Sequence, residues 1–217
     1  TFTKQTPIEL LNGVPTSIAV GDLNGDGYPD LVLSGGGGLY VILNNGSGGF
    51  NAPGYYNLAY TDWSGYVATQ DVGPILVADI NHDGHMDVVF GFTDFDPQTA
   101  TYPNVSSFGS YAGYLGVALG NGDGTLRLSG APPYVSVYGT ESGNIVDIAL
   151  ADLTGNGNLD LITTGDSYYS CVLPGNGDGT FQNASIGGGS SVATCFSTSG
   201  LLGDNLVVAD FNGDGKP

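Results

Sequence analysis

The chain has 217 residues, of which 41% are hydrophobic and only 11% are charged. Lys and Arg number three against 21 Asp and Glu, giving a formal charge of −18, so no basic patch is available to neutralise nucleic-acid phosphates. No apolar run approaches the roughly 20 residues of a membrane span, and no signal peptide is visible at residue 1, as expected of a mature or excised segment. With 38 Gly and 11 Pro, the composition predicts an all-β chain of short strands and turns around a buried core.

One acidic pattern recurs four times along the chain. It reads DLNGDGYPD at 22–30, DINHDGHMD at 79–87, DLTGNGNLD at 152–160 and DFNGDGKP at 210–217. Oxygen-bearing side chains at positions 1, 3, 5 and 9, with glycines between them, form the ligand set that a hard cation takes from a tight loop. The pattern therefore predicts a calcium ion in each loop.

The expected calcium ligands are the side chains at positions 1, 3, 5 and 9 and the backbone carbonyl at position 7. Loop by loop they are Asp22, Asn24, Asp26, Tyr28 and Asp30; Asp79, Asn81, Asp83, His85 and Asp87; Asp152, Thr154, Asn156, Asn158 and Asp160; and Asp210, Asn212 and Asp214. The last aspartate of each complete loop is expected to close the site as a bidentate ligand. The third loop has one carboxylate fewer and should bind most weakly of the complete loops. Four calcium ions would reduce the formal charge from −18 to about −10.

The acidic loops lie between apolar and β-branched runs that have no helical periodicity, so we expect hairpin loops between strands rather than EF-hands. A second landmark follows each of the first three loops: NGSGGF at 45–50, NGDGTL at 121–126 and NGDGTF at 176–181. The acidic loops begin 57, 73 and 58 residues apart. Each repeat therefore predicts four antiparallel strands, with the acidic loop between strands one and two and the Asn-Gly turn between strands three and four.

These motifs resemble the FG-GAP/VCBS repeat family, which includes the head domain of integrin α chains and a group of propeller lectins. The resemblance is carried by the D-x-N-x-D-G-x-x-D loops at 22–30 and 79–87, the looser copy at 152–160 and the N-G-D-G-T-F turns, and it covers essentially the whole chain. It implies a β-propeller with calcium in the loops between strands one and two of its blades. A calcium β-roll of nonapeptide repeats would have a far shorter period.

We expect a single propeller segment over 1–217, with complete blades at 14–70, 71–143 and 144–201. Residues 1–13 would supply strand four of a preceding blade, and residues 202–217 would begin a further blade. Because closed propellers need about four to eight blades, three arrangements are open. The chain could be a segment of a longer one, copies could complete one another as a ring or a head-to-tail filament, or roughly 25–30 further residues could finish a four-bladed ring.

Aromatic residues gather in the segments expected at the blade ends opposite the calcium loops, at 54–66, 92–114 and 167–169. Such rings stack on sugars and anchor protein partners. The side chains predicted to contact a carbohydrate or protein ligand are Trp63, Tyr56, Tyr60, Tyr66, Tyr102 and Tyr111, with Trp63 as the first choice. The alternative is that these rings pack the long connections onto the blade ends.

Cys171 and Cys195 are the only cysteines. We expect a disulfide between strand three of the third blade and the connection that follows the blade, with two buried free thiols as the alternative. A disulfide and loops suited to millimolar calcium indicate an extracellular or cell-surface protein.

Catalytic groups are scarce in the sequence. The only histidines, His82 and His85, lie in one acidic loop, where both side chains are expected to face solvent, so no Ser-His-Asp set can be assembled elsewhere. A catalytic pair of carboxylates, as in glycosidases, is left as an alternative, because Asp62, Asp94 and Asp96 occur in the aromatic segments. We expect a calcium-binding recognition or adhesion module and no enzyme. The alternatives are a structural protein that assembles through open blade edges and, less favoured, a polysaccharide-degrading domain.

Overall fold

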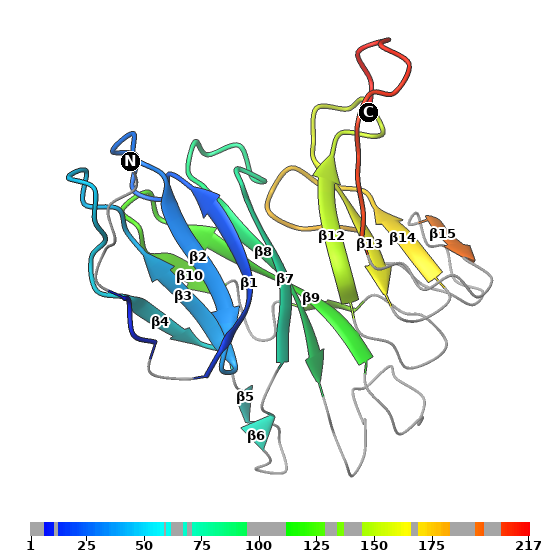
Figure 1. Ribbon diagram of the computed structural model, residues 1–217. Helices are drawn as coiled ribbons and strands as arrows, with labels where there is room; N and C mark the ends of the chain where they lie inside the picture. Colours follow the sequence, from blue (N-terminus) through cyan, green and yellow to red (C-terminus); the bar gives the residue numbers. More distant parts are fainter. Residues whose placement is uncertain are drawn as a thin grey trace.

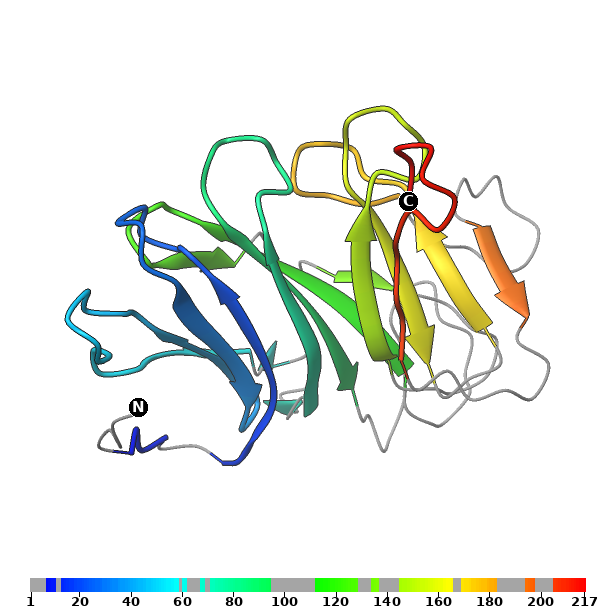
Figure 2. The same ribbon diagram turned by 45° about the horizontal axis from the view of Figure 1, so that its top comes forward.

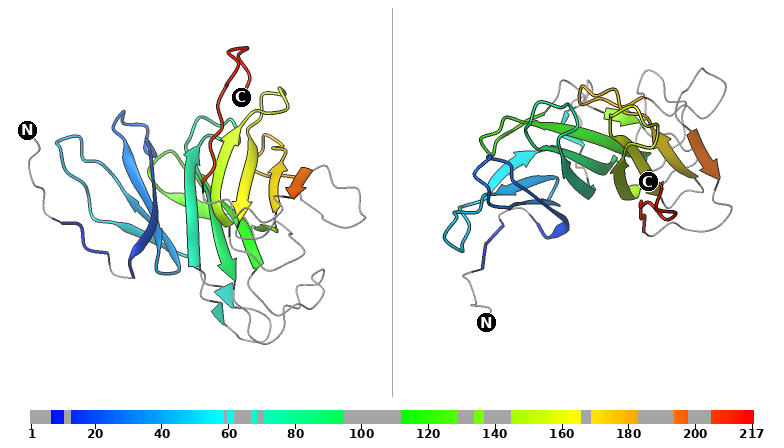
Figure 3. Two further views of the ribbon diagram at one scale, coloured as in Figure 1. Left: turned by 45° about the vertical axis from the view of Figure 1, so that its right-hand side comes forward. Right: turned by 90° about the horizontal axis from the view of Figure 1, so that it is seen from above.

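The computed structural model describes residues 7–10, 13–58, 60–61, 67–68, 71–94, 112–128, 134–136, 145–165, 169–182, 194–197 and 205–217. Within these ranges the chain forms strands and turns and contains no helix. Three larger antiparallel sheets stand side by side along an arc, as the view from above in Figure 3 shows. Over the same ranges, no helix could cross a membrane.

The first sheet contains β1 (Pro15–Gly21), β2 (Asp30–Gly35), β3 (Gly38–Ile42) and β4 (Gly54–Asn57), paired in chain order (Figure 1). Every neighbouring pair is antiparallel. The β1–β2 hairpin carries the first acidic loop, and the β3–β4 hairpin carries the first Asn-Gly turn. The four-stranded order predicted for one repeat is therefore confirmed in this sheet.

The second sheet contains β7 (Asp71–Ala78), β8 (Asp87–Asp94), β9 (Ala112–Gly120) and β10 (Leu126–Leu128), again in chain order. The short strand β11 (Tyr134–Ser136) also pairs with β9, at 114–116, whereas β10 pairs with 118–120. The fourth strand of this repeat is thus divided into two pieces, which the sequence did not predict. Before this sheet, β5 (Tyr60–Thr61) and β6 (Val67–Ala68) form a separate small hairpin.

The third sheet contains β12 (Ile145–Ala151), β13 (Asp160–Gly165), β14 (Tyr169–Leu173) and β15 (Thr194–Ser197). Cys171 of β14 lies opposite Cys195 of β15, and the two form a disulfide. The prediction that Cys195 lies in the connection after the blade was wrong, because the residue belongs to the fourth strand itself. The corresponding place in the first sheet holds the facing rings of Tyr40 and Tyr55, whose centroids are 4.8 Å apart. Both pairs join strand three to strand four.

The end segments were expected to belong to partial blades. Residues 7–10 contain no strand, and the rest of 1–13, except its last residue, lies outside the described residues. Residues 205–210 run beside the third sheet without a strand partner among the described residues (Figure 2). The backbone N–H of Leu206 donates to Oδ2 of Asp147 at 2.7 Å, which holds this segment against β12. No sheet among the described residues closes the arc.

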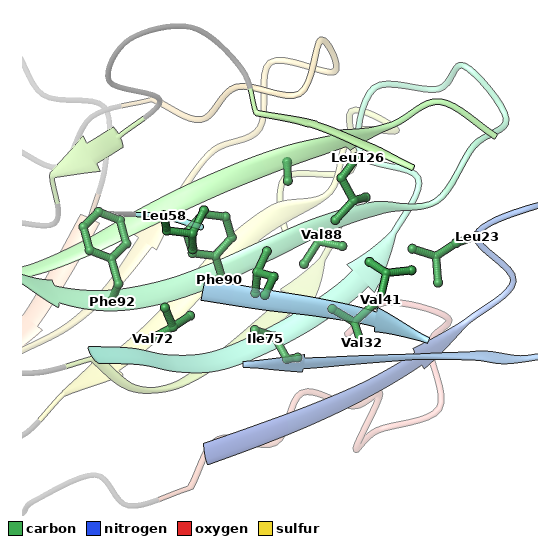
Figure 4. Packing of buried hydrophobic residues seen from close by; sticks show 12 residues of the cluster. Leu23, Val32, Val41, Leu58, Val72, Ile75, Val88, Phe90, Phe92 and Leu126 are labelled. Carbon is green, nitrogen blue, oxygen red and sulfur yellow. The ribbon is translucent and has the colours of Figure 1, made fainter. Parts of the chain in front are cut away.

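Two cores fill the spaces between successive sheets. Between the first and second sheets, side chains of both sheets pack together (Figure 4). They include Val32 and Val41 of the first sheet and Ile75 and Phe90 of the second. A second core, which includes Val89, lies between the second and third sheets. Because successive side chains of a strand point to opposite faces, Val89 belongs to the second core while its neighbours Val88 and Phe90 belong to the first. The continuous apolar run of β8 follows from burial on both faces.

Candidate functional site

The four acidic loops and the Asn-Gly turns gather at one end of the sheets, and the β5–β6 hairpin lies at the other end (Figure 1). Each of the first three acidic loops joins the first two strands of its sheet, and the fourth follows the segment 205–210. The antiparallel order of the strands produces this arrangement, because alternate connections of a meander return to the same end. The prediction that the acidic loops lie between strands one and two of each sheet is therefore confirmed for the first three loops.

The backbone of all four loops takes the same left-handed conformation at positions 4 and 6. In the first loop these are Gly25, with φ of 70°, and Gly27, with φ of 84°. The second loop has His82 at position 4, with φ of 60°, and it is the only non-glycine residue with positive φ among those described. The conformation turns N–H groups inward: Asp22 accepts from Asp26 N–H at 3.2 Å through Oδ1 and from Gly27 N–H at 2.8 Å through Oδ2.

The side chains at positions 3 and 5 lie beside each other in three of the loops. The amide of Asn24 donates to Oδ2 of Asp26 at 2.9 Å, and Asn81 donates to Asp83 in the same way at 2.9 Å. The pair of Asn212 and Asp214 repeats this contact at 3.0 Å. Bonding to the His85 N–H, followed by the Asn81 amide, lowers the pKa of the Asp83 carboxyl below its ordinary value. Each of these loops therefore brings an amide and a carboxylate to one side.

The aspartate at position 9 has partners that the sequence did not predict. Asp30, Asp87 and Asp160 are completely buried. Asp87 accepts from Ile80 N–H at 3.1 Å and from Gly120 N–H at 2.8 Å, one bond to each carboxylate oxygen. Burial raises the pKa of the Asp87 carboxyl, and the two N–H bonds lower it in part. Asp87 thus ties its acidic loop to the end of β9.

The other two complete loops repeat this clasp. Asp30 accepts from Leu23 N–H at 2.9 Å and from Asn44 N–H at 2.7 Å. Asp160 accepts from Leu153 N–H and from Gly175 N–H, both at 3.0 Å. The expectation of a dedicated bidentate metal ligand at position 9 left out this role, in which the carboxylate joins the acidic loop to the Asn-Gly turn of the same sheet. A metal contact of these three aspartates stays a prediction.

The second loop contains a buried oxygen that lacks a partner. Oδ2 of Asp79 accepts from Gly84 N–H at 3.0 Å, whereas Oδ1 is buried and has no hydrogen-bond partner among the described residues. An unpaired buried carboxylate oxygen is costly unless a cation or another donor compensates it. No three carboxylate, imidazole or thiolate groups in the described ranges converge on one point. A cation here would therefore also need the amide and carbonyl oxygens of the loop as ligands, and Ca²⁺ accepts ligands of this kind.

In the first three acidic loops, the residue at position 7 joins the loop to the Asn-Gly turn of the same sheet. A Cβ built on Gly46 would lie 2.9 Å from the ring of Tyr28, and Cβ atoms on Gly122 and Gly177 would overlap the side chains of His85 and Asn158. The glycine after each turn asparagine is therefore required by this close packing as well as by its positive φ. His82, exposed like His85, reaches the next sheet, where its Nε2 lies 3.2 Å from Oδ1 of Asn158.

The predicted aromatic ligand residues are mostly outside the described residues. This holds for Trp63, Tyr66, Tyr102 and Tyr111, and Tyr60 belongs to β5. Tyr56 differs from its expected place at an exposed rim, because its ring packs partly buried against the first core. Its hydroxyl accepts from Leu126 N–H of the second sheet at 3.0 Å. Tyr56 therefore joins two sheets, a role that the sequence did not predict.

Comparison with known proteins places these loops in a family. The family model described as an FG-GAP-like repeat matches residues 22–90 and 152–217. No curated protein matches the chain. The chain is similar to the solved structure titled as the basis of specific recognition of non-reducing terminal N-acetylglucosamine by an Agrocybe aegerita lectin, with 28% identity and a TM-score of 0.46. That match covers 84% of this chain, which spans 38% of the length of the other. The family model covers more than half of the residues, and the chain belongs to the FG-GAP-like repeat family.

Proposed function

We propose that this chain is a calcium-stabilised recognition module of a β-propeller kind. In this proposal the acidic loops bind Ca²⁺ at one end of the sheets, and the aromatic segments at the opposite end bind a carbohydrate or protein ligand. We infer an extracellular setting, and the Cys171–Cys195 disulfide supports it because such bonds persist in oxidising compartments. No catalytic role is proposed for any residue.

A propeller arrangement is supported by how the sheets meet. The first strand of the second sheet, β7, contacts β1 and β2 of the first sheet and β12 of the third. First strands of successive sheets therefore lie next to one another, while the fourth strands form the outer edge of the arc (Figure 3). Repeating this step would carry the arc around a central axis, as blades of a propeller do.

The observation that carries the calcium proposal is the buried Oδ1 of Asp79, which has no hydrogen-bond partner in the described part of the chain. Side-chain oxygens of Asp79, Asn81 and Asp83 and the carbonyl of His85 would hold the ion, and corresponding residues would do so in the other loops. A bound Ca²⁺ would neutralise the loop and hold strand one to strand two. The neighbouring N–H bonds to Asp79 and Asp83 already fix the positions of these carboxylates.

Counting bound ions tests this part of the proposal. Native mass spectrometry in calcium should show three or four ions on the wild-type chain and one fewer on Asp79→Ala. Asp123→Ala removes an exposed turn carboxylate that accepts from Thr125 and should leave the count unchanged. Equal counts for the two variants, or no bound calcium in any species, would contradict the assignment.

The recognition proposal is supported by the position of the β5–β6 hairpin at the end opposite the acidic loops (Figure 1). In the sequence, Trp63 falls between these two strands. An indole ring offers a large apolar face together with one N–H donor, which suits both sugar stacking and protein contacts. The acidic end offers a different surface, rich in carboxylates.

Replacing Trp63 with alanine is expected to weaken ligand binding about 10-fold or more, since loss of an aromatic anchor costs roughly 1.4 kcal/mol or more. Ligands would first be found on a glycan array and among extracellular proteins and then measured by calorimetry. Phe50→Ala, which removes an exposed ring beside an Asn-Gly turn, is the matched control and should bind normally. Equal affinity of both variants for every ligand would reject the aromatic segments as the binding surface.

A further inference from the structure

The turn at 45–49 differs in sequence from the two turns that correspond to it. It reads NGSGG, whereas the turns at 121–125 and 176–180 both read NGDGT. All three close in the same way, because the backbone N–H of the first residue donates to the carbonyl of the fifth at 3.0 Å. Serine in place of aspartate makes residues 45–47 an Asn-x-Ser sequon, the sequence at which N-linked glycans are attached. The other two turns are not sequons.

The side-chain amide nitrogen of the asparagine is engaged in the second and third turns. Nδ2 of Asn121 donates to Oγ1 of Thr125 at 2.8 Å, and Nδ2 of Asn176 donates to Oγ1 of Thr180 at 2.8 Å. The aspartate of the turn holds the threonine in place, since Oδ1 of Asp123 accepts from Thr125 N–H at 2.9 Å. In these two turns the threonine hydroxyl therefore occupies one side of the amide nitrogen.

The amide group of Asn45 is used in a different way in the first turn. Its Oδ1 accepts from Ser47 N–H at 2.9 Å, from the Ser47 hydroxyl at 2.7 Å and from Gly49 N–H at 3.1 Å. Its Nδ2 donates to none of the described residues. A Cβ built on Gly49 would lie 3.0 Å from this nitrogen, so glycine at the place of the threonine leaves the space beside Nδ2 open.

Asn45 and Ser47 are both exposed. This exposure does not depend on where the given sequence begins, as the second turn shows. There a Cβ built on Gly124 would lie 2.7 Å from Leu43 of the preceding sheet, yet Asn121 of the same turn is exposed as well. The first turn lies at the end of the sheets opposite the β5–β6 hairpin (Figure 1). A glycan on Asn45 would therefore leave the proposed recognition surface uncovered.

We propose that Nδ2 of Asn45 is a site of N-linked glycosylation. The donor is an oligosaccharide joined through its C1 to a lipid pyrophosphate, and the enzyme is the oligosaccharide transferase of the secretory pathway. The bond between Nδ2 and C1 forms as the bond between C1 and the pyrophosphate oxygen breaks. That oxygen leaves with the electron pair, and Nδ2 gives up one of its two protons to a base of the transferase. The inference rests on the extracellular setting proposed above, because a chain meets this donor in the secretory pathway.

The folded turn accommodates the product without losing a hydrogen bond. A sugar on Nδ2 leaves the three hydrogen bonds to Oδ1 of Asn45 in place, and Nδ2 has no partner among the described residues to lose. The same substituent on Asn121 would compete with the hydroxyl of Thr125 for the space beside the nitrogen. The two sequence differences of the first turn, serine for aspartate and glycine for threonine, therefore favour the same modification.

The test is peptide mapping of the full chain, secreted from eukaryotic cells behind an added signal peptide. Peptide N-glycosidase in heavy-oxygen water converts each glycosylated asparagine to a labelled aspartate. The label is expected at Asn45 and not at Asn121, which is the matched control because Asn-Gly sequences also deamidate spontaneously. Ser47→Ala keeps Asn45 but removes the sequon, so it should abolish the label, and Ser47→Thr should retain it.

An unlabelled Asn45 in the secreted, folded chain would overturn the proposal. An equally strong label in Ser47→Ala, or at Asn121, would also overturn it, since the label would then report deamidation. The sequons at 104–106 and 183–185 lie outside the described residues, and a label at either of them without one at Asn45 would show that transfer occurred but not at this site. Circular dichroism verifies that each chain is folded.

Two further measurements separate this proposal from the proposed function. A label in the recombinant chain that is missing from the protein of its natural source would reject the extracellular setting, and the proposal with it. Native mass spectrometry of the same recombinant sample counts bound calcium. A labelled chain without calcium would retain the glycosylation site and reject the calcium-stabilised module, whereas an unlabelled chain with calcium would do the reverse.

Discussion

Replacing Asp87 with alanine is expected to lower the free energy of unfolding by about 3–5 kcal/mol, since the substitution leaves two buried N–H groups unpaired at roughly 1–3 kcal/mol each and removes buried contacts. Those N–H groups belong to Ile80 and Gly120, and Asp87 is completely buried between them. The loss of stability should affect both the loop and the sheet, because one carboxylate joins the acidic loop after β7 to the end of β9. Urea denaturation followed by fluorescence measures the change.

The measurement belongs in calcium-free buffer, so that a lost metal ligand does not contribute. Asp87→Asn keeps one acceptor oxygen but sets an amide donor against a backbone N–H, so it should be destabilised almost as strongly. Asp123→Ala serves as the control, since its exposed carboxylate accepts from Thr125 of its own turn, and should unfold with nearly the wild-type midpoint. If Asp87→Ala is destabilised only when calcium is present, the carboxylate acts through the metal and the clasp described above is not its role.

The repeat plan could be predicted from the sequence because it depends on local signals. Acidic loops with glycines at fixed positions, and alternating strands on either side of them, set the strand order of all three sheets. The positive φ of Gly25 and Gly27 is one such local consequence. His82 shows that the conformation belongs to the loop rather than to glycine, because the same position is left-handed without it.

The partners of individual side chains could not be predicted, because they come from distant parts of the chain. Asp87 and Gly120 are 33 residues apart, and Tyr56 and Leu126 are 70 residues apart in different sheets. Position 9 reads as a metal ligand in the isolated loop, and only the register of β8 against β9 brings Gly120 N–H within reach. Tyr56 reads as an exposed ring in a Tyr-rich segment until the second sheet covers it. The place of Cys195 likewise depends on the pairing of β14 with β15.

Removing calcium is expected to lower the free energy of unfolding by about 4 kcal/mol, if the three complete loops bind with Kd near 0.1 mM and 1 mM Ca²⁺ is present, since each site then contributes about 1.4 kcal/mol by mass action. The unfolding temperature should fall by roughly 8–16 °C on chelation, at 2–4 °C per kcal/mol for a chain of this size.

Measuring the unfolding temperature in Mg²⁺ at the same concentration separates specific Ca²⁺ binding from general screening of the protein's charge. Mg²⁺ supplies the same charge to a chain of formal charge −18, but its strict octahedral geometry and reluctance to lose water disfavour these loops. Equal unfolding temperatures in the two cations would show that charge screening alone stabilises the fold. Asp79→Ala should remove about a third of the calcium effect, because it disables one of three complete loops, while Asp152→Ala should remove less, since the third loop has fewer carboxylates and is expected to bind more weakly. The reverse order of these two variants would show that the buried Oδ1 of Asp79 does not mark the stronger site.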